Sequence, residues 1–297
     1  MTHDLSDRTI FLTGGTSGFG RVAVVNLAQR GATVAVVGRD ESKGATLTEQ
    51  SNDLAGTIAF HQADLASQST VRHLATTVKH EYDQIDVLAH NAGLSAESRR
   101  ESPDGIEITL AVNHLAPYLL TYELLDHLRD APDPRVVVTA SDIHRRATLD
   151  LDDLQLTDEY DSLDAYARSK LANIAFTVEL DDRLPDDSAV TVNCVHPGFV
   201  PSTELFREAS LRTRLLVRIA GLVPGVATSK QEAAERLQSL LVEARYGSVS
   251  GQYISNDGPT DPAPEATNQA VRRQLWRVSA ELVGITPDWP IRALYLA

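Results

Sequence analysis

Two side chains suited to proton transfer lie four residues apart in the segment Tyr166-Ala-Arg-Ser-Lys170. On a helix, residues at this spacing share one face, so the phenol and the ammonium would be neighbours. A phenol has an ordinary pKa of about 10, and a nearby ammonium lowers that pKa because it favours the phenolate. The pair indicates a tyrosine acting as general acid or base beside an electrostatic partner, with an exposed surface pair as the alternative.

Ser141 is a second candidate because it ends the predicted strand Arg135–Ala140. Ligands of open α/β sheets bind at the carboxyl ends of the strands. A hydroxyl at that place can donate a hydrogen bond to a substrate carbonyl and stabilise a developing alkoxide. The alternative is a serine that only caps the end of the strand.

A glycine-rich turn, Thr13-Gly-Gly-Thr-Ser-Gly-Phe-Gly20, follows the first predicted strand and opens a predicted helix. Its glycines let the backbone turn tightly and approach a pyrophosphate, which the free N–H groups and positive dipole end of the helix would attract. The spacing is G-x-x-x-G-x-G, not the G-x-G-x-x-G of two-domain dehydrogenases. The turn predicts cofactor contacts at Gly14, Thr16, Ser17, Gly18, Phe19 and Gly20.

The choice of dinucleotide is indicated at the end of the second predicted strand, in Val34-Ala-Val-Val-Gly-Arg-Asp40. An acidic residue there would bind the ribose 2′-hydroxyl of NAD. That place falls at Gly38, and the next side chain is Arg39, whose guanidinium favours a 2′-phosphate. Asp40 is a competing signal, two places beyond the usual acid. NADP (NADPH) is therefore predicted, with NAD as the weaker alternative.

The chain alternates short β-branched runs with helical periodicity, which predicts an α/β fold: one doubly wound parallel sheet (a Rossmann fold) in a single domain, residues 1–297. The predicted strands are Thr9–Thr13, Thr33–Val37, Thr57–Gln62, Val87–His90, Arg135–Ala140, Val190–Val195 and Gln252–Ser255. The predicted helices are Gly18–Arg30, Glu41–Leu54, Ser67–Tyr82, Ile106–Arg129, Ala165–Leu184 and Lys230–Ala244.

The formal charge of −14, from 27 Lys and Arg against 41 Asp and Glu, argues against nucleic acid and anionic membranes as partners. No apolar run reaches the length of a membrane span, and the N-terminus lacks a signal pattern, so a cytoplasmic protein is expected.

No metal site is predicted, because the chain has one cysteine and its histidines lack the spacing of metal ligands. With 25 Asp and four Lys, the composition also suggests salt adaptation, an ordinary acidic enzyme being the alternative.

Together, Thr13–Gly20, Asn91-Ala-Gly93, Asn113, Ser141, Tyr166 and Lys170 resemble the short-chain dehydrogenase/reductase family, in the family's order. Five further stretches resemble the retinol dehydrogenase branch: Asn113–Thr121, Ser169–Asn173, His196-Pro-Gly198 and, in the tail, Ser250–Ile254 and Leu275–Ser279. One stretch, Ser202–Glu208, is more similar to protochlorophyllide reductase.

The resemblance implies a role for each matching residue. Tyr166 would donate the proton, Lys170 would support it and hold the nicotinamide ribose, Ser141 would anchor the carbonyl, and Asn113 would hold a relay water. Further cofactor contacts are implied at Asp64 and Leu65, at Asn91, Ala92 and Gly93, and at Pro197, Gly198 and Thr203. Thr203 lies one residue later than in the retinol dehydrogenase pattern, so Ser202 is an alternative nicotinamide contact.

The predicted function is an NADP-dependent oxidoreductase that transfers hydride between the nicotinamide and a carbonyl or alcohol of a fairly apolar small substrate. Two alternatives remain: a reductase of a tetrapyrrole-like C=C bond, and a non-catalytic NADP-binding regulatory protein. The stretch 198–229 is expected to form a substrate lid, within which Leu211–Val223 could instead lie on a membrane surface. A homo-oligomer is left open.

Overall fold

The computed structural model describes residues 4–129, 131–202, 205, 221, 227–255 and 258–290. At its centre is an eight-stranded sheet in the order β3-β2-β1-β4-β5-β6-β7-β8. Neighbouring strands run parallel except for β8, which pairs antiparallel with β7. The strands are β1 (Thr9–Thr13), β2 (Thr33–Gly38), β3 (Thr57–Gln62), β4 (Val87–His90), β5 (Arg135–Thr139), β6 (Thr191–His196), β7 (Tyr253–Ser255) and β8 (Gly258–Pro259).

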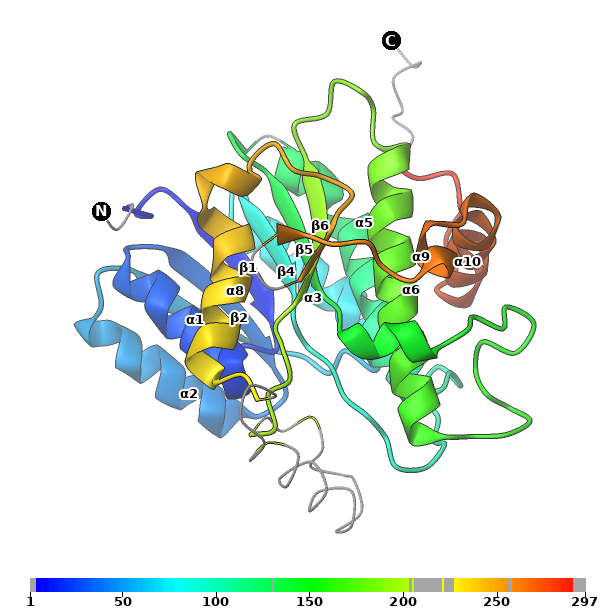
Figure 1. Ribbon diagram of the computed structural model, residues 1–297. Coiled ribbons are helices and arrows are strands. Elements are labelled where there is room, and N and C mark those ends of the chain that lie inside the picture. The colour runs from blue at the N-terminus through cyan, green and yellow to red at the C-terminus, as the bar shows by residue number, and fades with distance from the viewer. Residues whose placement is uncertain are drawn as a thin grey trace.

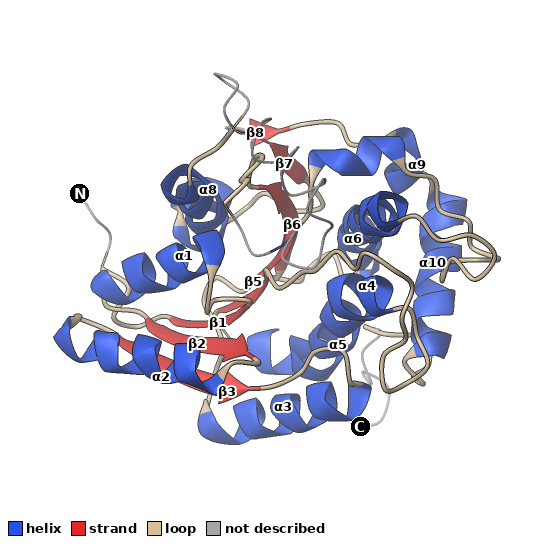
Figure 2. Ribbon diagram, turned by 90° about the horizontal axis from the view of Figure 1, so that it is seen from below, coloured by secondary structure: helices blue, strands red, loops and turns tan. Residues whose placement is uncertain are grey.

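Helices cover both faces of the sheet (Figures 1 and 2), with α1, α2 and α8 on one face and α3, α5 and α6 on the other. The helices are α1 (Gly18–Gln29), α2 (Glu41–Gln50), α3 (Gln68–Glu81), α4 (Ile108–Leu110), α5 (Ala116–Arg129), α6 (Ser162–Arg183), α8 (Lys230–Val242), α9 (Pro264–Thr267) and α10 (Gln269–Leu282). The predicted doubly wound parallel sheet is therefore confirmed.

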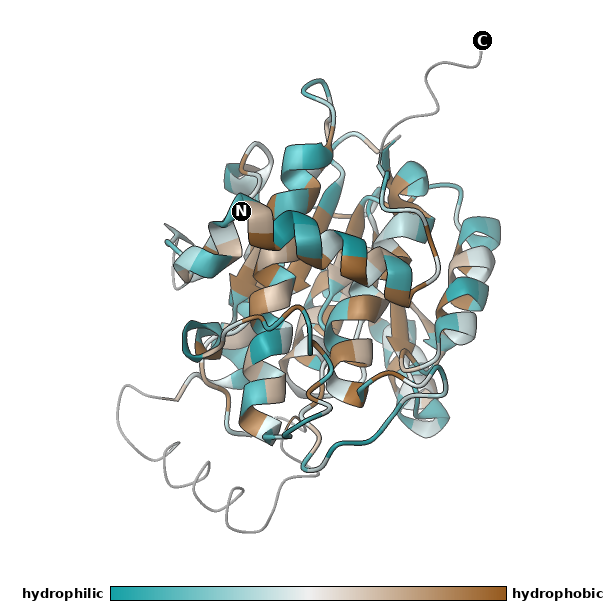
Figure 3. Cartoon of the chain, turned by 90° about the vertical axis from the view of Figure 1, so that its right-hand side faces the viewer, coloured by the Kyte–Doolittle hydropathy of each residue, from teal (hydrophilic) through white to brown (hydrophobic). Residues whose placement is uncertain are grey.

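The central strands are buried on both faces, as continuous apolar runs predict. Every residue of β5 is buried, and Val136, Val137 and Val138 alternate between the apolar clusters on the two faces of the sheet. Figure 3 shows the same layering, with brown strands inside and largely teal outer helices. The burial of these strands leaves their carboxyl ends as the places where polar side chains can reach a ligand.

The predicted helix Ile106–Arg129 is interrupted in the structure. Helix α4 starts at Ile108, capped by the Glu107 carboxylate, and Ala111–Leu115 forms a π-helical turn before α5. Pro117 explains the irregularity because it has no N–H to close the α-helical bond to the carbonyl of Asn113. The predicted stretch is thus helical from Ile108 to Arg129, and its π-helical turn contains Asn113.

The C-terminal elements β8, α9 and α10 were not predicted. Helix α10 packs against α6 with Leu275 and Trp276 buried, while its other face is polar. Among the described helices, none is both long and apolar enough to cross a membrane. Most of the expected lid, and nearly all of Leu211–Val223, fall outside the described residues, so those expectations have no structural counterpart here.

Candidate active site

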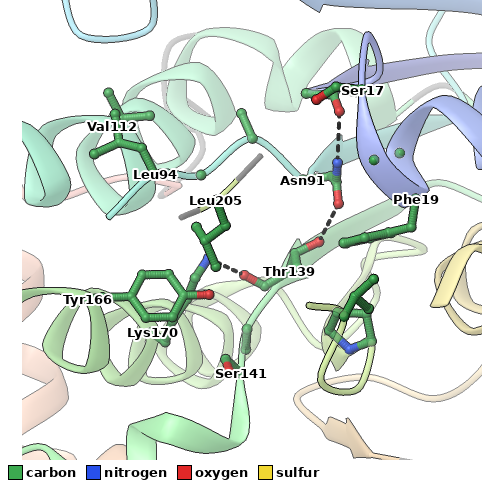
Figure 4. A pocket seen from close by; sticks show the side chains of 18 of the residues that line it. Ser17, Phe19, Asn91, Leu94, Val112, Thr139, Ser141, Tyr166, Lys170 and Leu205 are labelled. Atoms are coloured by element: carbon green, nitrogen blue, oxygen red, sulfur yellow. Dashed lines mark hydrogen bonds between the residues drawn. The ribbon is translucent and has the colours of Figure 1, made fainter. Parts of the chain in front are cut away.

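A cavity of about 1140 Å³ opens at the carboxyl ends of the parallel strands (Figure 4). Its volume exceeds the range of about 300–1,000 Å³ that is usual for one small ligand, so a cofactor and a substrate can share it. Most of the predicted site residues line it: Gly14, Thr16, Ser17, Gly18, Phe19, Gly20, Arg39, Asp64, Leu65, Asn91, Ala92, Gly93, Ser141, Tyr166, Lys170, Pro197 and Gly198. Thr203 lies outside the described residues.

The glycine-rich turn has the conformation that its glycines permit. Gly14 and Gly18 have φ of +70° and +58°, a region that other residues rarely adopt. A Cβ at Gly20 would lie 2.4 Å from the Gly14 carbonyl oxygen, so the turn closes on itself only with glycine there. Ser17, the N-cap of α1, has extended backbone and makes no side-chain cap, and no acid lies in the first turn. The first N–H groups of α1 are thus able to bind an anion.

Two cationic side chains and Gly38 line the end of the cavity beside β2. The Asp40 carboxylate accepts from the backbone N–H of Lys43 at 3.1 Å and caps α2, so it is engaged as a helix cap. Arg39 and Lys43 both line the cavity there. A Cβ at Gly38 would lie 2.7 Å from Thr16 Cγ2, so a larger residue there would require Thr16 to move.

Asn91 joins the glycine-rich turn to the centre of the sheet. Its Nδ2 donates to the Gly14 carbonyl at 3.1 Å, and its Oδ1 accepts from Thr139 Oγ1 at 3.2 Å. Thr13 Oγ1 accepts from the N–H groups of Asn91 and Ala92 at 3.0 and 3.1 Å. These bonds fix the three strand ends β1, β4 and β5 relative to one another.

Lys170 and Tyr166 project from α6 into the cavity, where Figure 4 shows both beside Ser141. Lys170 Nζ donates to the Thr139 carbonyl at 2.8 Å and lies 5.6 Å from the centre of the Tyr166 ring. The lysine is 2% exposed, and burial lowers its pKa to about 8. An ammonium with that pKa is still largely charged at pH 7.

Burial raises the pKa of the Tyr166 phenol above its ordinary value, and a hydrogen bond with the Ser141 side chain opposes this shift less strongly. The net shift is upward because burial has the largest effect. A raised pKa keeps the phenol protonated near neutral pH, when it can donate its proton. Tyr166 and Ser141 are thus brought together as two hydroxyl groups at one end of the cavity.

Asn113 lies behind the cavity wall, where a Cβ at Gly93 would be 3.4 Å from its Oδ1. The amide donates to the Leu94 carbonyl and to Ser169 Oγ, each at 2.9 Å, and accepts from the Leu94 N–H at 2.8 Å. Because both amide hydrogens are used, the side chain is not free to bind a water by donation. Pro117 has no N–H, so it cannot make the α-helical bond to the Asn113 carbonyl.

Apolar side chains also line the cavity: Leu94, Val112, Ile143, Leu163, Phe199, Val200 and Leu205. These residues were not predicted, since they come from loops and helix turns far apart in the sequence. Lys43, His196, Thr228 and Arg236 also line the cavity and were missed as site residues. A signal existed for Lys43, a cation four residues after Arg39 in the first turn of a predicted helix.

Thr139 was missed as well, although it is central to the geometry. Its hydroxyl holds Asn91 and its carbonyl holds Lys170. The sequence offers no signal for this double role, because it depends on two residues from other strands and helices. Among the residues that the structure describes, no group of three or more His, Cys, Asp or Glu is placed to hold a metal ion.

Comparison with known proteins agrees with this geometry. The family model for short chain dehydrogenases matches residues 8–213. Human retinol dehydrogenase 13 is 35% identical over 94% of this chain and 85% of its own length, and human retinol dehydrogenase 12 is 36% identical over 95% and 88%. Human polyprenol dehydrogenase is 33% identical over 94% of this chain and 86% of its own length.

Solved structures show the same fold. An uncharacterized protein from Mycobacterium paratuberculosis has a TM-score of 0.77 and 27% identity, over 97% of each chain. RhlG of Pseudomonas aeruginosa, in an NADP active-site complex, has a TM-score of 0.68 and 25% identity, over 86% of this chain and 96% of its own. By sequence, fold and the arrangement of its cavity, the chain belongs to the short-chain dehydrogenase/reductase family of oxidoreductases, which use nicotinamide cofactors.

Proposed function

We propose that the chain is an NADP-dependent oxidoreductase that interconverts the carbonyl and alcohol forms of a fairly apolar small molecule. One observation carries the proposal: Ser141, Tyr166 and Lys170 lie at one end of the cavity that the glycine-rich turn begins, and apolar side chains line the same cavity. When bound, a nicotinamide cofactor supplies or accepts the hydride. The remaining chemistry, binding the oxygen and moving its proton, falls to the side chains of this chain.

In the proposed mechanism, the Ser141 hydroxyl donates a hydrogen bond to the substrate oxygen, and that bond strengthens as negative charge develops there. Tyr166 gives its phenolic proton to the same oxygen during reduction and takes it back during oxidation. The Lys170 ammonium stabilises the resulting phenolate through its charge. The carbonyl of Asn113 would hold the water that returns a proton from solvent.

The same cavity would hold the cofactor along the strand ends. The N–H groups at the start of α1 would bind the pyrophosphate. Arg39 and Lys43 would bind the 2′-phosphate through charge-assisted hydrogen bonds. Asp64 and Leu65 would contact the adenine, and Asn91–Gly93 with Pro197 and Gly198 the nicotinamide half. RhlG, seen with NADP, supports this choice of cofactor.

The apolar lining of the cavity supports an apolar substrate, because burying each CH₂ group there stabilises the complex by about 0.8 kcal/mol. The names of the relatives support the same conclusion, since retinol and polyprenol are alcohols with long apolar chains.

The proposed function is tested by a screen of aldehydes, ketones and alcohols that follows the absorbance of the reduced cofactor. Tight NADPH binding without turnover of any compound would favour a non-catalytic regulatory protein. Reduction of a tetrapyrrole C=C bond, with no turnover of carbonyls or alcohols, would favour the C=C reductase.

Removing the guanidinium of Arg39 should weaken the preference for NADPH over NADH. We expect Arg39→Ala to raise the Kd for NADPH roughly tenfold, about 1.4 kcal/mol, and to leave the Kd for NADH unchanged. Fluorescence titration with each cofactor measures both constants. Arg39→Lys is the matched control, which should retain part of the preference because it keeps the charge. Equal affinities of the unmodified protein for the two cofactors would contradict the assignment of NADP.

We also propose that the acidic composition adapts the chain to salt. With 41 Asp and Glu against 27 Lys and Arg, the folded chain repels itself, and added salt screens that repulsion. The melting temperature should therefore rise as KCl increases from low to molar concentration. Differential scanning calorimetry at a fixed pH measures it. A melting temperature that stays level or falls over this range would contradict salt adaptation and favour an ordinary acidic enzyme.

A further inference from the structure

His144 is a buried side chain close to the site to which the proposed mechanism gives no role. It lies in the 3₁₀ turn Asp142–Arg146 that follows Ser141, and it is 0% exposed. Its Nδ1 is 2.8 Å from the carbonyl oxygen of Ser141, and its Nε2 is 3.0 Å from the backbone nitrogen of Ala263. The ring thus bridges the Ser141 backbone and the segment that leads into α9.

The two partners determine where the imidazole proton lies. A carbonyl can only accept, so Nδ1 carries a hydrogen and donates it to Ser141. The Ala263 N–H can only donate, so Nε2 offers its lone pair. One neutral tautomer satisfies both bonds, and the doubly protonated ring would lose the bond to Ala263.

The surroundings hold the ring in this state. Tyr253, on β7, meets the ring edge-on at 5.0 Å between centres, and its hydroxyl donates to Asp142 Oδ1 at 2.9 Å. Arg145 donates to Asp142 Oδ1 at 3.2 Å and to the Asp261 carbonyl at 2.7 Å. Burial lowers the pKa of His144, the Ser141 carbonyl opposes that shift, and the charges of Arg145 and Asp142 act in opposite directions.

We propose that His144 is a positioning residue for Ser141, which holds the Ser141 backbone against Ala263 and thereby aims the serine hydroxyl at the substrate oxygen. The segment from β8 to α9, which crosses in front of α6 in Figure 1, becomes part of the support of the site. This inference rests on the proposed function through the role of Ser141. It explains why a residue with no surface in the cavity is tied so closely to one that lines it.

Two substitutions separate the two bonds of the ring. In His144→Asn the side-chain NH₂ reaches the place of Nδ1 and can still donate to the Ser141 carbonyl. In His144→Gln the longer side chain brings its oxygen to the place of Nε2, which keeps the bond to Ala263 and loses the one to Ser141. The Gln variant should lose about tenfold in kcat and the Asn variant less than about threefold, with the Kd for NADPH unchanged in both.

A double-mutant cycle with Ser141→Ala decides whether His144 acts through the serine. If it does, His144→Gln should lower kcat in the unmodified protein and have no further effect in the Ser141→Ala background. Independent, multiplying losses would overturn the inference, as would equal activity of the Gln and Asn variants. If the Gln variant fails to fold, judged by melting and NADPH binding, the smaller loss of the Asn variant must vanish in the same background.

The cycle also distinguishes the two levels of the proposal. Ser141→Ala alone should lower kcat more than it changes the Kd for NADPH, because its bond strengthens with charge on the substrate oxygen. An unchanged kcat in that variant would overturn the role of Ser141 and the inference about His144 together. A lowered kcat without coupling to His144 would overturn only the inference.

Discussion

Tyr166→Phe should lower turnover by at least about 100-fold and leave the affinity for NADPH nearly unchanged. The substitution keeps the ring, which is 8% exposed and packed into the wall of the cavity, and removes only the hydroxyl. Burial raises the pKa of that hydroxyl, so it stays protonated near neutral pH and can donate its proton as the proposed mechanism requires. Steady-state kinetics and fluorescence titration with NADPH measure the two quantities separately.

Tyr246→Phe provides a matched control, since that tyrosine is 4% exposed and lies away from the cavity. It should turn over like the unmodified protein. Retained activity in Tyr166→Phe would show that another group supplies the proton, and the mechanism proposed for this chain would fail. A loss of NADPH binding equal to the loss of turnover would instead assign the phenol to the cofactor site.

The second large effect is expected from Lys170→Met, which keeps most of the length of the side chain and removes its charge. Turnover should fall by at least about 100-fold, because the phenolate of Tyr166 loses its neighbouring ammonium. The Kd for NADPH should rise about tenfold, because the ammonium is also the group proposed to hold the nicotinamide ribose. The same two assays, run side by side with those for Tyr166→Phe, measure both losses.

The comparison of Lys170→Met with Tyr166→Phe distinguishes the two roles, since only the lysine substitution should change both turnover and the Kd for NADPH. Lys230→Met, at the exposed start of α8, is the control for removing one positive charge from an acidic chain. An unchanged affinity for NADPH in Lys170→Met would remove the lysine from the cofactor site. Unchanged turnover would show that the phenol does not need a charged partner.

The parallel sheet could be predicted because its strands carry their own signal. A run such as Val136–Val138 is apolar on both faces, and only a strand covered by helices on each side buries both. The glycine turn and the Tyr166–Lys170 pair could be predicted for a related reason. Each is a local pattern whose chemistry depends on spacing along one turn or one helix.

The parts that were missed depend on contacts between distant segments. Thr139 acts by holding Asn91 and Lys170, and His144 by bridging to Ala263, and no local pattern specifies either partner. The upward pKa shift of Tyr166 depends on burial, which sequence spacing does not reveal. Helix α10 does have apolar residues at helical spacing, but its arginines and glutamines make the segment polar on average. Its apolar face becomes evident only from its packing against α6.

The contact between positions 38 and 16 also constrains how such a chain could change its cofactor over evolutionary time. An acid at Gly38 would supply the charge that favours NAD, yet its Cβ would lie 2.7 Å from Thr16 Cγ2 and 3.0 Å from Thr16 Oγ1. Thr16→Ala removes both of those atoms and adds no charge. A descendant that acquired the acid first would have to move the Thr16 side chain aside, whereas one that lost the threonine first would have room for the acid but would lose a predicted cofactor contact. The order of the two substitutions therefore determines how much crowding the turn meets on the way.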